Sequence, residues 1–104
     1  MKRSVWLMAL ALVAGSVWAK TVVIDVRTPQ EFAQDHIAGA LNIDYTVIAQ
    51  EISRASVSKE DTVILYCRSG NRSGIAQNTL KQLGYLRAEN YGGIAQARQR
   101  LQIR

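Results

Sequence analysis

The sequence predicts a small α/β domain with a mainly parallel sheet of about four to five strands flanked by helices. Short apolar or β-branched segments alternate along the chain with segments whose apolar residues recur at spacings of three and four. Residues 63–66 are apolar throughout, as expected for a strand covered on both faces of a parallel sheet. The 104 residues suffice for one such domain and no second.

The first 19 residues have the three-part pattern of a secretory signal peptide. Positions 2 and 3 are basic, residues 5–13 are apolar, and Val17 and Ala19 occupy the −3 and −1 positions of a cleavage site. The alternative, a membrane anchor, needs about 20 apolar residues, and this run is shorter. We therefore expect cleavage after Ala19 and a periplasmic protein with no stable membrane association. A single domain would then occupy residues 20–104.

The charge of the chain and the spread of its basic residues argue against a nucleic-acid partner. Removing the first 19 of the 104 residues leaves 85 residues with 11 basic and 8 acidic side chains, a formal charge of +3. The basic residues are spread along the chain, with some clustering at Arg98, Arg100 and Arg104. They form no stripe of the kind that binds nucleic acid, so we expect no nucleic-acid partner. We also expect a monomer.

Each predicted element has a local signal. Thr28 suits the N-cap position with Glu31 three residues later, Pro29 suits the first helical position, and Gly84 suits the position after a helix. The residues 91–93 are expected to form a turn. The predicted elements, in chain order, are strand 21–24, helix 29–34, strand 41–43, helix 45–55, strand 62–66, helix 73–83, a poorly patterned strand within 85–90, and helix 94–101.

The central feature is a strand, a loop and a helix with Cys67 at the junction. Ligands of parallel α/β sheets bind at the carboxyl ends of strands and at the helix N-termini beside them. Successive backbone N–H groups in the tight loop 67–72 can converge on one anion or one sulfur atom. Cys67 is the only cysteine, so no internal disulfide is possible. Its place at a strand end favours a reactive thiol over a buried core residue.

Further motifs lie before and after this loop. The N-terminal group comprises Asp25-Val26-Arg27, Glu31-Phe32, residues 36–40 (His-Ile-Ala-Gly-Ala) and Asn42-Ile43, and it resembles the N-terminal motifs of the rhodanese family. Residues 67–73 are similar to the family's catalytic loop, and Gly84-Tyr85 and Gly92-Gly93 to its C-terminal motif. The resemblance covers nearly all of the predicted mature chain in the right order. One departure is the absence of a tryptophan after the Gly-Gly pair, which concerns the packing of the last helix.

The resemblance implies a sulfurtransferase that works without metal or cofactor. The loop cysteine would take a sulfane sulfur from a donor such as thiosulfate, become a persulfide, and pass the sulfur to cyanide or a thiol. The attacking species must be a thiolate, which the helix N-terminus and two nearby arginines favour. The candidate site residues are Cys67 as nucleophile and, for substrate binding, Arg68, Ser69, Gly70, Asn71, Arg72 and Ser73.

Individual site residues have alternative interpretations. Arg68 and Arg72 can bind the thiosulfate dianion by paired N–H donors, or be solvated loop charges. Ser69 and Ser73 can donate to the sulfur, although for Ser73 capping of the helix is the preferred interpretation. His36 can pair with the cysteine, but a structural role in its turn is favoured. Asp25 and Arg27 are also interpreted as scaffold residues, with a minor alternative in which Arg27 lines the pocket.

Two other functions are alternatives, a cysteine phosphatase and a persulfide carrier. Cysteine phosphatases place an arginine after five intervening residues, whereas here Arg72 comes one position too early, so the loop is one residue short for a phosphate. A dedicated persulfide carrier or stress-related sulfur-binding module would use the same Cys67 chemistry. Turnover with thiosulfate and small thiol acceptors separates that alternative from an enzyme.

Overall fold

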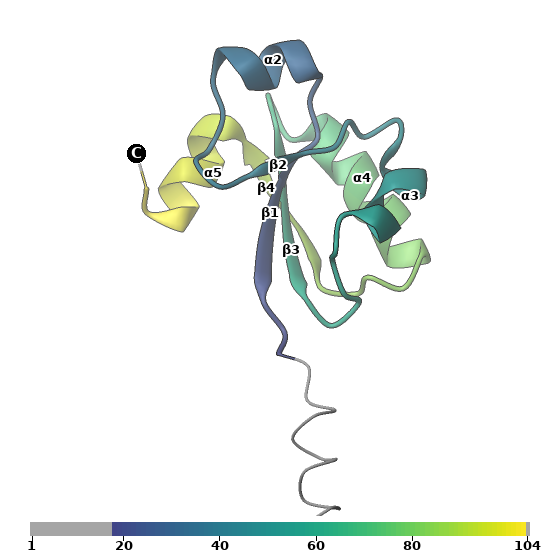
Figure 1. The fold of residues 1–104 in the computed structure, drawn as a ribbon. Coiled ribbons are helices and arrows are strands. Elements are labelled where there is room, and N and C mark those ends of the chain that lie inside the picture. The colour runs from purple at the N-terminus through teal and green to yellow at the C-terminus, as the bar shows by residue number, and fades with distance from the viewer. Residues whose placement is uncertain (1–17, 104) are drawn as a thin grey trace, which may run out of the picture.

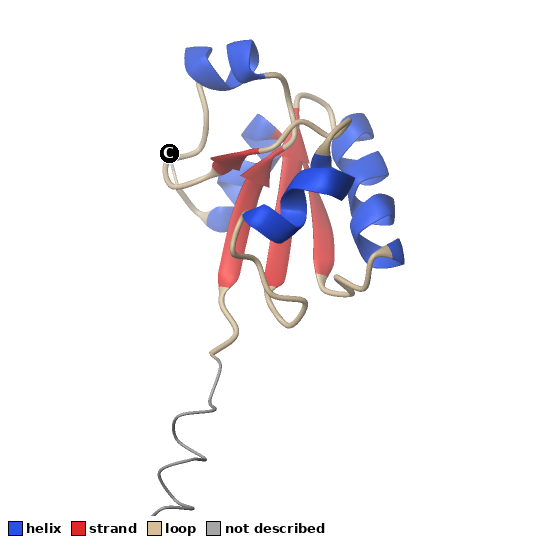
Figure 2. Cartoon of the chain, turned by 45° about the vertical axis from the view of Figure 1, so that its right-hand side comes forward, coloured by secondary structure: helices blue, strands red, loops and turns tan. Residues whose placement is uncertain are grey.

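The computed structural model describes residues 18–103, which form one sheet with helices on both faces (Figure 1, Figure 2). The elements, in chain order, are β1 (Thr21–Asp25), α2 (Pro29–Gln34), β2 (Leu41–Asn42), α3 (Ile48–Glu51), the 3₁₀ helix η1 (Ile52–Arg54), β3 (Thr62–Cys67), α4 (Asn71–Gln82), β4 (Ala88–Gly93) and α5 (Ile94–Leu101). The predicted α/β class and parallel sheet are confirmed. Except for its last two residues, the predicted signal peptide lies outside the described residues.

The sheet of the described chain has four parallel strands in the order β2-β1-β3-β4. Strand β3 lies in its interior, and all its residues after Thr62 are buried, as the unbroken apolar run predicts. Strand β2 is only two residues long and pairs with Ile24 and Asp25 of β1. The register between β3 and β4 shifts between Leu65 and Cys67, next to the predicted site.

The two faces of the sheet bury two separate apolar clusters. The larger cluster joins Val63 and Leu65 of β3 to residues of α3, η1 and α4, and it includes Cys67. The smaller cluster packs Tyr66 and Ile37 against Ala97 of α5. Full burial of a valine, leucine or isoleucine side chain in these clusters contributes about 1.5–3 kcal/mol to the stability of the fold. Ala97 is completely buried, so the last helix packs closely on the sheet without the family's tryptophan.

Several local predictions are confirmed. Thr28 and Glu31 form the reciprocal capping box at the start of α2, whose bounds are those expected. Gly84 follows α4 with a φ of +102°, and the N–H of Tyr85 donates to the carbonyl of Leu80. None of the six residues of α2 is buried, and this helix lies beyond the carboxyl ends of the strands (Figure 1).

The helix expected over 45–55 is shorter than predicted. The side chain of Asp44 accepts hydrogen bonds from the backbone N–H and the hydroxyl of Thr46, which holds residues 44–47 in a turn. The helix therefore begins at Ile48 and ends as the 3₁₀ turn η1. Ile48 and Ile52 are buried as expected, but Val47 is 43% exposed and does not belong to the apolar face.

Two boundaries beside the predicted site are also wrong. Helix α4 begins at Asn71, because Gly70 adopts a left-handed conformation and its carbonyl accepts from Gly74. Ser73 lies inside the helix, and Gly70 is the N-cap residue, so the capping role predicted for Ser73 is wrong. Residues 91–93, expected as a turn, are the end of strand β4.

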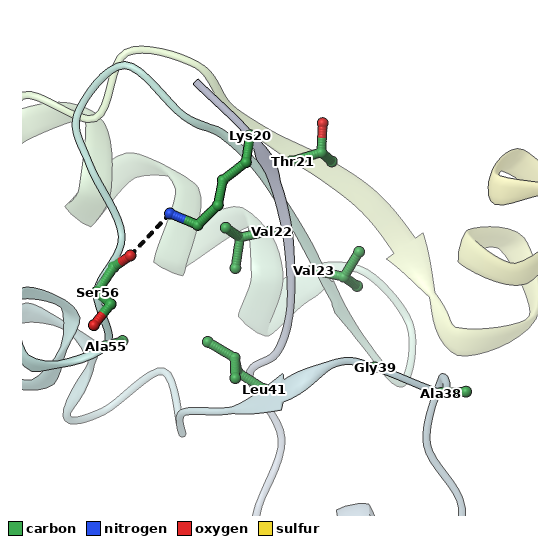
Figure 3. Close-up of a pocket in the computed structure, with 9 residues that line it drawn as sticks. All are labelled: Lys20, Thr21, Val22, Val23, Ala38, Gly39, Leu41, Ala55 and Ser56. Carbon is green, nitrogen blue, oxygen red and sulfur yellow. Dashed lines mark hydrogen bonds between the residues drawn. The ribbon is translucent and has the colours of Figure 1, made fainter. Parts of the chain in front are cut away.

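Within residues 18–103, no helix combines the length and the apolar composition needed to cross a membrane. A cavity of about 310 Å³ lies beside the first half of β1, where β2 does not extend (Figure 3). It is mainly apolar, and Lys20 at its rim donates to the carbonyl of Ser56 over 2.9 Å. Because β1 and β3 are parallel, this cavity lies at the amino end of the sheet, opposite Cys67.

Candidate active site

Cys67 is the last residue of β3, and the chain turns within residues 67–70, the Cys67 loop, before α4 begins. The residue is buried, with 1% of its surface exposed. The backbone N–H of Gly70 donates to the sulfur over 2.9 Å, and the Ser73 hydroxyl oxygen lies 3.3 Å from the same sulfur. The predicted convergence of loop N–H groups and a helix start on one sulfur atom is thus present.

Two opposing effects act on the pKa of the Cys67 thiol. Burial raises the pKa, because a charged thiolate loses hydration in the interior. A Ser73 hydroxyl hydrogen turned toward the sulfur, and hydrogen bonds from the backbone N–H groups of Ser73, Ser69 and Gly70, lower it. The hydrogen bonds outweigh burial, so the pKa lies below the ordinary thiol value. A cysteine in this environment forms a nucleophilic thiolate more readily than a free cysteine.

The Cys67 loop lies directly against the end of β4. A methyl group placed on Gly93 would lie 2.3 Å from the carbonyl oxygen of Arg68, and one on Gly70 would lie 3.2 Å from the Cα of Gly92. Gly70 and Gly92 also have positive φ angles of +100° and +87°. The Gly-Gly pair is therefore needed because the loop backbone packs onto it, not because it forms a turn.

Asn90 of β4 holds the loop in place, a role that was not predicted from the sequence. Its side-chain nitrogen donates to the carbonyl of Gly70 over 3.0 Å, while its side-chain oxygen accepts from the Gly92 N–H over 2.9 Å. The same oxygen accepts from the Ser73 hydroxyl over 2.7 Å. The available signal was an asparagine inside a strand segment, where this residue type is unfavourable unless its side chain has a specific task.

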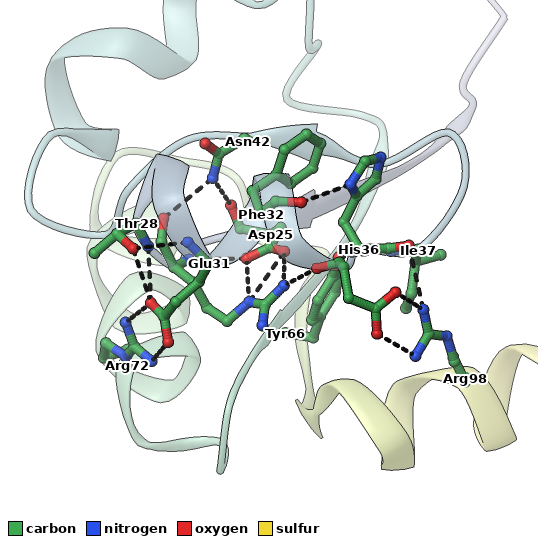
Figure 4. Close-up of polar contacts among 12 residues, drawn as sticks. Asp25, Thr28, Glu31, Phe32, His36, Ile37, Asn42, Tyr66, Arg72 and Arg98 are labelled. Carbon is green, nitrogen blue, oxygen red and sulfur yellow. Dashed lines mark hydrogen bonds and ion pairs between the residues drawn. The ribbon is translucent and has the colours of Figure 1, made fainter.

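The two arginines that follow Cys67, Arg68 and Arg72, lie in different environments. Arg72 donates to both carboxylate oxygens of Glu31, over 2.8 and 3.0 Å (Figure 4), and both side chains are partly exposed. This hydrogen-bonded pair holds the pKa of Glu31 at about 2. Arg68 is exposed, and within residues 18–103 its side chain makes no hydrogen bond or ion pair.

The remaining loop residues take no part in side-chain contacts with the sulfur. Ser69 is exposed, and it acts on Cys67 through its backbone N–H. Asn71 is the exposed first residue of α4. The predicted loop therefore contributes mainly through its backbone.

Asp25 and Arg27 are buried scaffold residues, as predicted. The Arg27 guanidinium donates to both oxygens of Asp25 over 2.7–3.1 Å, and also to the carbonyl of Asp35 over 2.6 Å. Asn42 donates to the carbonyls of both Asp25 and Arg27. This network fixes the chain after β1 and the C-terminal end of α2 (Figure 4).

His36 also has the structural role expected of it. Its Nδ1 lies 2.8 Å from the carbonyl oxygen of Phe32, and its ring stacks on the Phe32 ring with centroids 3.7 Å apart (Figure 4). The ring is exposed, and the hydrogen bonds of the Cys67 sulfur come from residues of its own loop and of α4. Within residues 18–103, no cluster of three or more histidine, cysteine or acidic side chains forms a metal site.

Comparisons with known proteins agree with this geometry. The model of the family "rhodanese-like domain" matches residues 10–98. Thiosulfate sulfurtransferase PspE of Escherichia coli (strain K12) is 43% identical over 89 residues, covering 85% of this chain and 86% of that protein. A sulfurtransferase of Allochromatium vinosum is 42% identical over 84 residues, covering 79% and 77%.

Solved structures show the same likeness. A rhodanese from E. coli, described with anions, has a TM-score of 0.70 at 39% identity and covers 73% of this chain and 89% of its own. The human single-domain sulfurtransferase TSTD1 has a TM-score of 0.62 at 28% identity and covers 83% of each chain.

Proposed function

The chain belongs to the rhodanese family, and we propose that it is a thiosulfate sulfurtransferase whose Cys67 carries the transferred sulfur. The observation that carries the proposal is the hydrogen bonding of the sulfur. Backbone N–H groups of the Cys67 loop point at it from the start of α4, and together they lower the thiol pKa despite burial.

The reaction consists of two displacements at sulfur. The Cys67 thiolate attacks the outer sulfur of thiosulfate, a new S–S bond forms, and sulfite leaves with the electron pair of the old S–S bond. A thiophilic acceptor then attacks the outer sulfur of the persulfide, and the thiolate is regenerated. Cyanide becomes thiocyanate, whereas a thiolate acceptor becomes a persulfide. Neither step needs a general acid, which agrees with the structural role of His36.

The loop N–H groups also support the persulfide. A persulfide anion carries its charge on the outer sulfur, and donors aimed at the Cys67 sulfur favour negative charge near that position. Preorganised backbone donors cost little to reorganise during the reaction, because the Gly-Gly pair and Asn90 already hold the loop. The same N–H donors stabilise the Cys67 persulfide anion as it forms during the attack on thiosulfate.

Arg68 is the principal side chain for binding the donor. Thiosulfate is a dianion, and a guanidinium can hold two of its oxygens at once. Arg72 already holds the two oxygens of Glu31, so its charge is largely neutralised, whereas Arg68 is exposed beside Cys67. The residues Ser69, Gly70 and Asn71 contribute chiefly through the backbone and through the shape of the loop. Ser73 also presents its hydroxyl to the Cys67 sulfur.

Export completes the proposal. Cleavage after Ala19 would leave one domain, residues 20–104, acting in the periplasm as a monomer. The geometry of Lys20 supports this cleavage, since its backbone N–H donates to the buried carboxylate of Asp61 over 2.9 Å. The α-ammonium group that cleavage creates can make the same contact with a full positive charge.

The direct test is the intact mass of the protein after incubation with thiosulfate and removal of excess reagent. We expect one added sulfur atom, lost again on addition of cyanide with release of thiocyanate. The Cys67→Ser variant serves as control and should fold normally but gain no mass. A wild-type protein that gains no sulfur, or a Cys67→Ser variant that retains most of the transfer activity, would refute the proposed function. A persulfide that forms but turns over only with a specific partner would identify the protein as a carrier.

A further inference from the structure

We infer that Asn90 is a positioning residue that acts on Cys67 through the Ser73 hydroxyl and restrains ionisation of the thiol. The inference rests on the proposed role of Cys67 as nucleophile. It concerns three side chains in a row: the Cys67 sulfur lies 3.3 Å from the Ser73 oxygen, which lies 2.7 Å from the Asn90 side-chain oxygen.

The orientation of the Asn90 amide is fixed by the backbone on both sides. Its oxygen accepts from the N–H of Gly92, and its nitrogen donates to the carbonyl of Gly70. The reversed amide would place an NH₂ group against an N–H donor and an oxygen against a carbonyl oxygen. The atom of Asn90 that faces Ser73 is therefore an oxygen, which can only accept a hydrogen bond.

The Ser73 hydroxyl has one hydrogen and two neighbours that compete for it. The residue is fully buried, so no water competes for this hydrogen without entering the core. The Ser73 hydrogen points to Asn90, because two oxygens 2.7 Å apart without a hydrogen between them repel each other. The Cys67 thiol then donates its own S–H hydrogen to the free lone pair of the Ser73 oxygen.

Ionisation of Cys67 breaks this arrangement. A thiolate has no hydrogen to donate, so if Ser73 keeps its bond to Asn90, oxygen lone pairs face a negative sulfur. If the hydroxyl turns to the sulfur, its bond to Asn90 is lost and two acceptor oxygens are left face to face. In either case the thiolate costs about one hydrogen bond that the thiol retains.

Two sets of contacts therefore act on Cys67 in opposite directions. The N–H groups of the Cys67 loop favour the thiolate, and Asn90 disfavours it by retaining the Ser73 hydrogen. This predicts an unusual sign: removal of Asn90 frees Ser73 to donate to the sulfur and makes the cysteine more acidic. A residue that merely held the loop in shape would have the opposite effect when removed, because the loop N–H donors would be lost.

The test is the pH dependence of the alkylation rate of Cys67, the only cysteine of the chain, by iodoacetamide. Asn90→Ala should lower the apparent pKa of Cys67 by about 0.5–1, the equivalent of one neutral hydrogen bond. In a Ser73→Ala background, the same Asn90→Ala change should leave the pKa where Ser73→Ala alone puts it. Asn90→Asp, which keeps the acceptor and adds a negative charge, should raise the pKa.

Gln77→Ala is the matched control, since Gln77 also joins α4 to β4 through one hydrogen bond, to the carbonyl of Ala88 over 3.0 Å. It should leave the pKa of Cys67 unchanged. Circular dichroism confirms the fold of each variant, and the opposite sign of Asn90→Asp allows a test even if Asn90→Ala unfolds. An unchanged or raised pKa in Asn90→Ala, or an equal drop without Ser73, overturns the inference. Alkylation needs no sulfur donor, so failure of the proposed function, seen as no mass gain with thiosulfate, remains a separate result.

Discussion

The two ends of the sheet each bury one aspartate in an ion pair, yet only one end is built for chemistry. At the carboxyl end Asp25 pairs with Arg27, and at the amino end Asp61 pairs with Lys20 over 2.8 Å. Both aspartates are fully buried. A buried charge with a partner is therefore a poor indicator of a functional site in this fold, because both pairs satisfy the needs of folding.

What distinguishes the carboxyl end is the direction of the backbone. There, β3 leads into α4, and the N–H groups at the start of that helix have no partner within the helix and can point at a ligand. At the amino end the chain enters the strands from turns, and the carboxylate of Asp61 accepts hydrogen bonds from the backbone N–H groups of Lys20 and Ser58. The N–H groups at the carboxyl end are therefore available to bind a sulfur anion. Those of Lys20 and Ser58 at the amino end are already hydrogen-bonded to Asp61 and stabilise a loop.

The largest effect on sulfur transfer among variants that leave Cys67 in place should come from Gly93→Ala. The added methyl group meets the Arg68 carbonyl at 2.3 Å, so the Cys67 loop must move. Overpacking of this kind costs about 1–3 kcal/mol of folding free energy, and we expect most of the transfer activity to be lost with it. Activity and thermal unfolding of the purified variant measure both.

Gly39→Ala is the matched control at the amino-end cavity. Gly39 has a φ of +85° but nothing lies within 4 Å of an added methyl group. It should cost roughly 1–2 kcal/mol of stability from backbone strain alone and leave sulfur transfer intact. Equal losses of transfer in both variants would show that general destabilisation, and not the shape of the loop, limits activity.

Arg68→Ala should have the next largest effect. A charge-assisted hydrogen bond to an ionised ligand is worth about 1.5–3 kcal/mol, so kcat/KM for thiosulfate should fall tenfold or more, mainly through KM. Added salt should weaken the wild-type enzyme in the same direction, because screening acts on the same attraction. Arg72→Ala should have a smaller effect, since Glu31 already holds its guanidinium. The reverse ranking would show that thiosulfate displaces Glu31 and binds Arg72.

How far these features could be predicted depends on whether they are local. Helix α2 and its capping box involve residues three positions apart, and the apolar run of β3 is contiguous, so a sequence pattern suffices for both. Asn90 acts on residues 17 and 20 positions away, and Glu31 on one 41 positions away. Those contacts exist only once the strands have been placed side by side, so no helical or strand periodicity in the sequence predicts them.

A smaller change is expected from Glu31→Gln, which removes the carboxylate that neutralises Arg72. An ion pair of this exposure is worth about 0.2–1 kcal/mol, so the KM for thiosulfate should fall by a factor of about 1.4 to 5 as Arg72 becomes available. Asp35→Asn is the control, because Asp35 ties the other end of α2 to Arg98 over 2.8 Å. If both variants change KM alike, α2 acts only as a cover over the site and the charge of Arg72 is irrelevant.

The smallest effect on sulfur transfer should come from Asp61→Asn at the amino end, although its effect on acid stability is distinct. Hydrogen bonds from the Lys20 side chain, the Lys20 backbone N–H and the Ser58 N–H outweigh burial and lower the pKa of Asp61 to about 2. The folded state therefore binds fewer protons than the unfolded state between about pH 4 and pH 2. The stability that this carboxylate contributes is present above the unfolded pKa and is lost as the pH falls through that window. Urea unfolding at several pH values should show that the free energy of unfolding falls less steeply toward acid pH in Asp61→Asn than in the wild type, with transfer at pH 7 unchanged.

Asp25→Asn, its counterpart at the carboxyl end, should reduce both stability and transfer, because the Arg27 network holds the chain beside the site. If Asp61→Asn loses transfer at pH 7 as severely as Asp25→Asn, the two ends of the sheet are coupled, and the catalytic role of the carboxyl end cannot be separated from the stability of the whole.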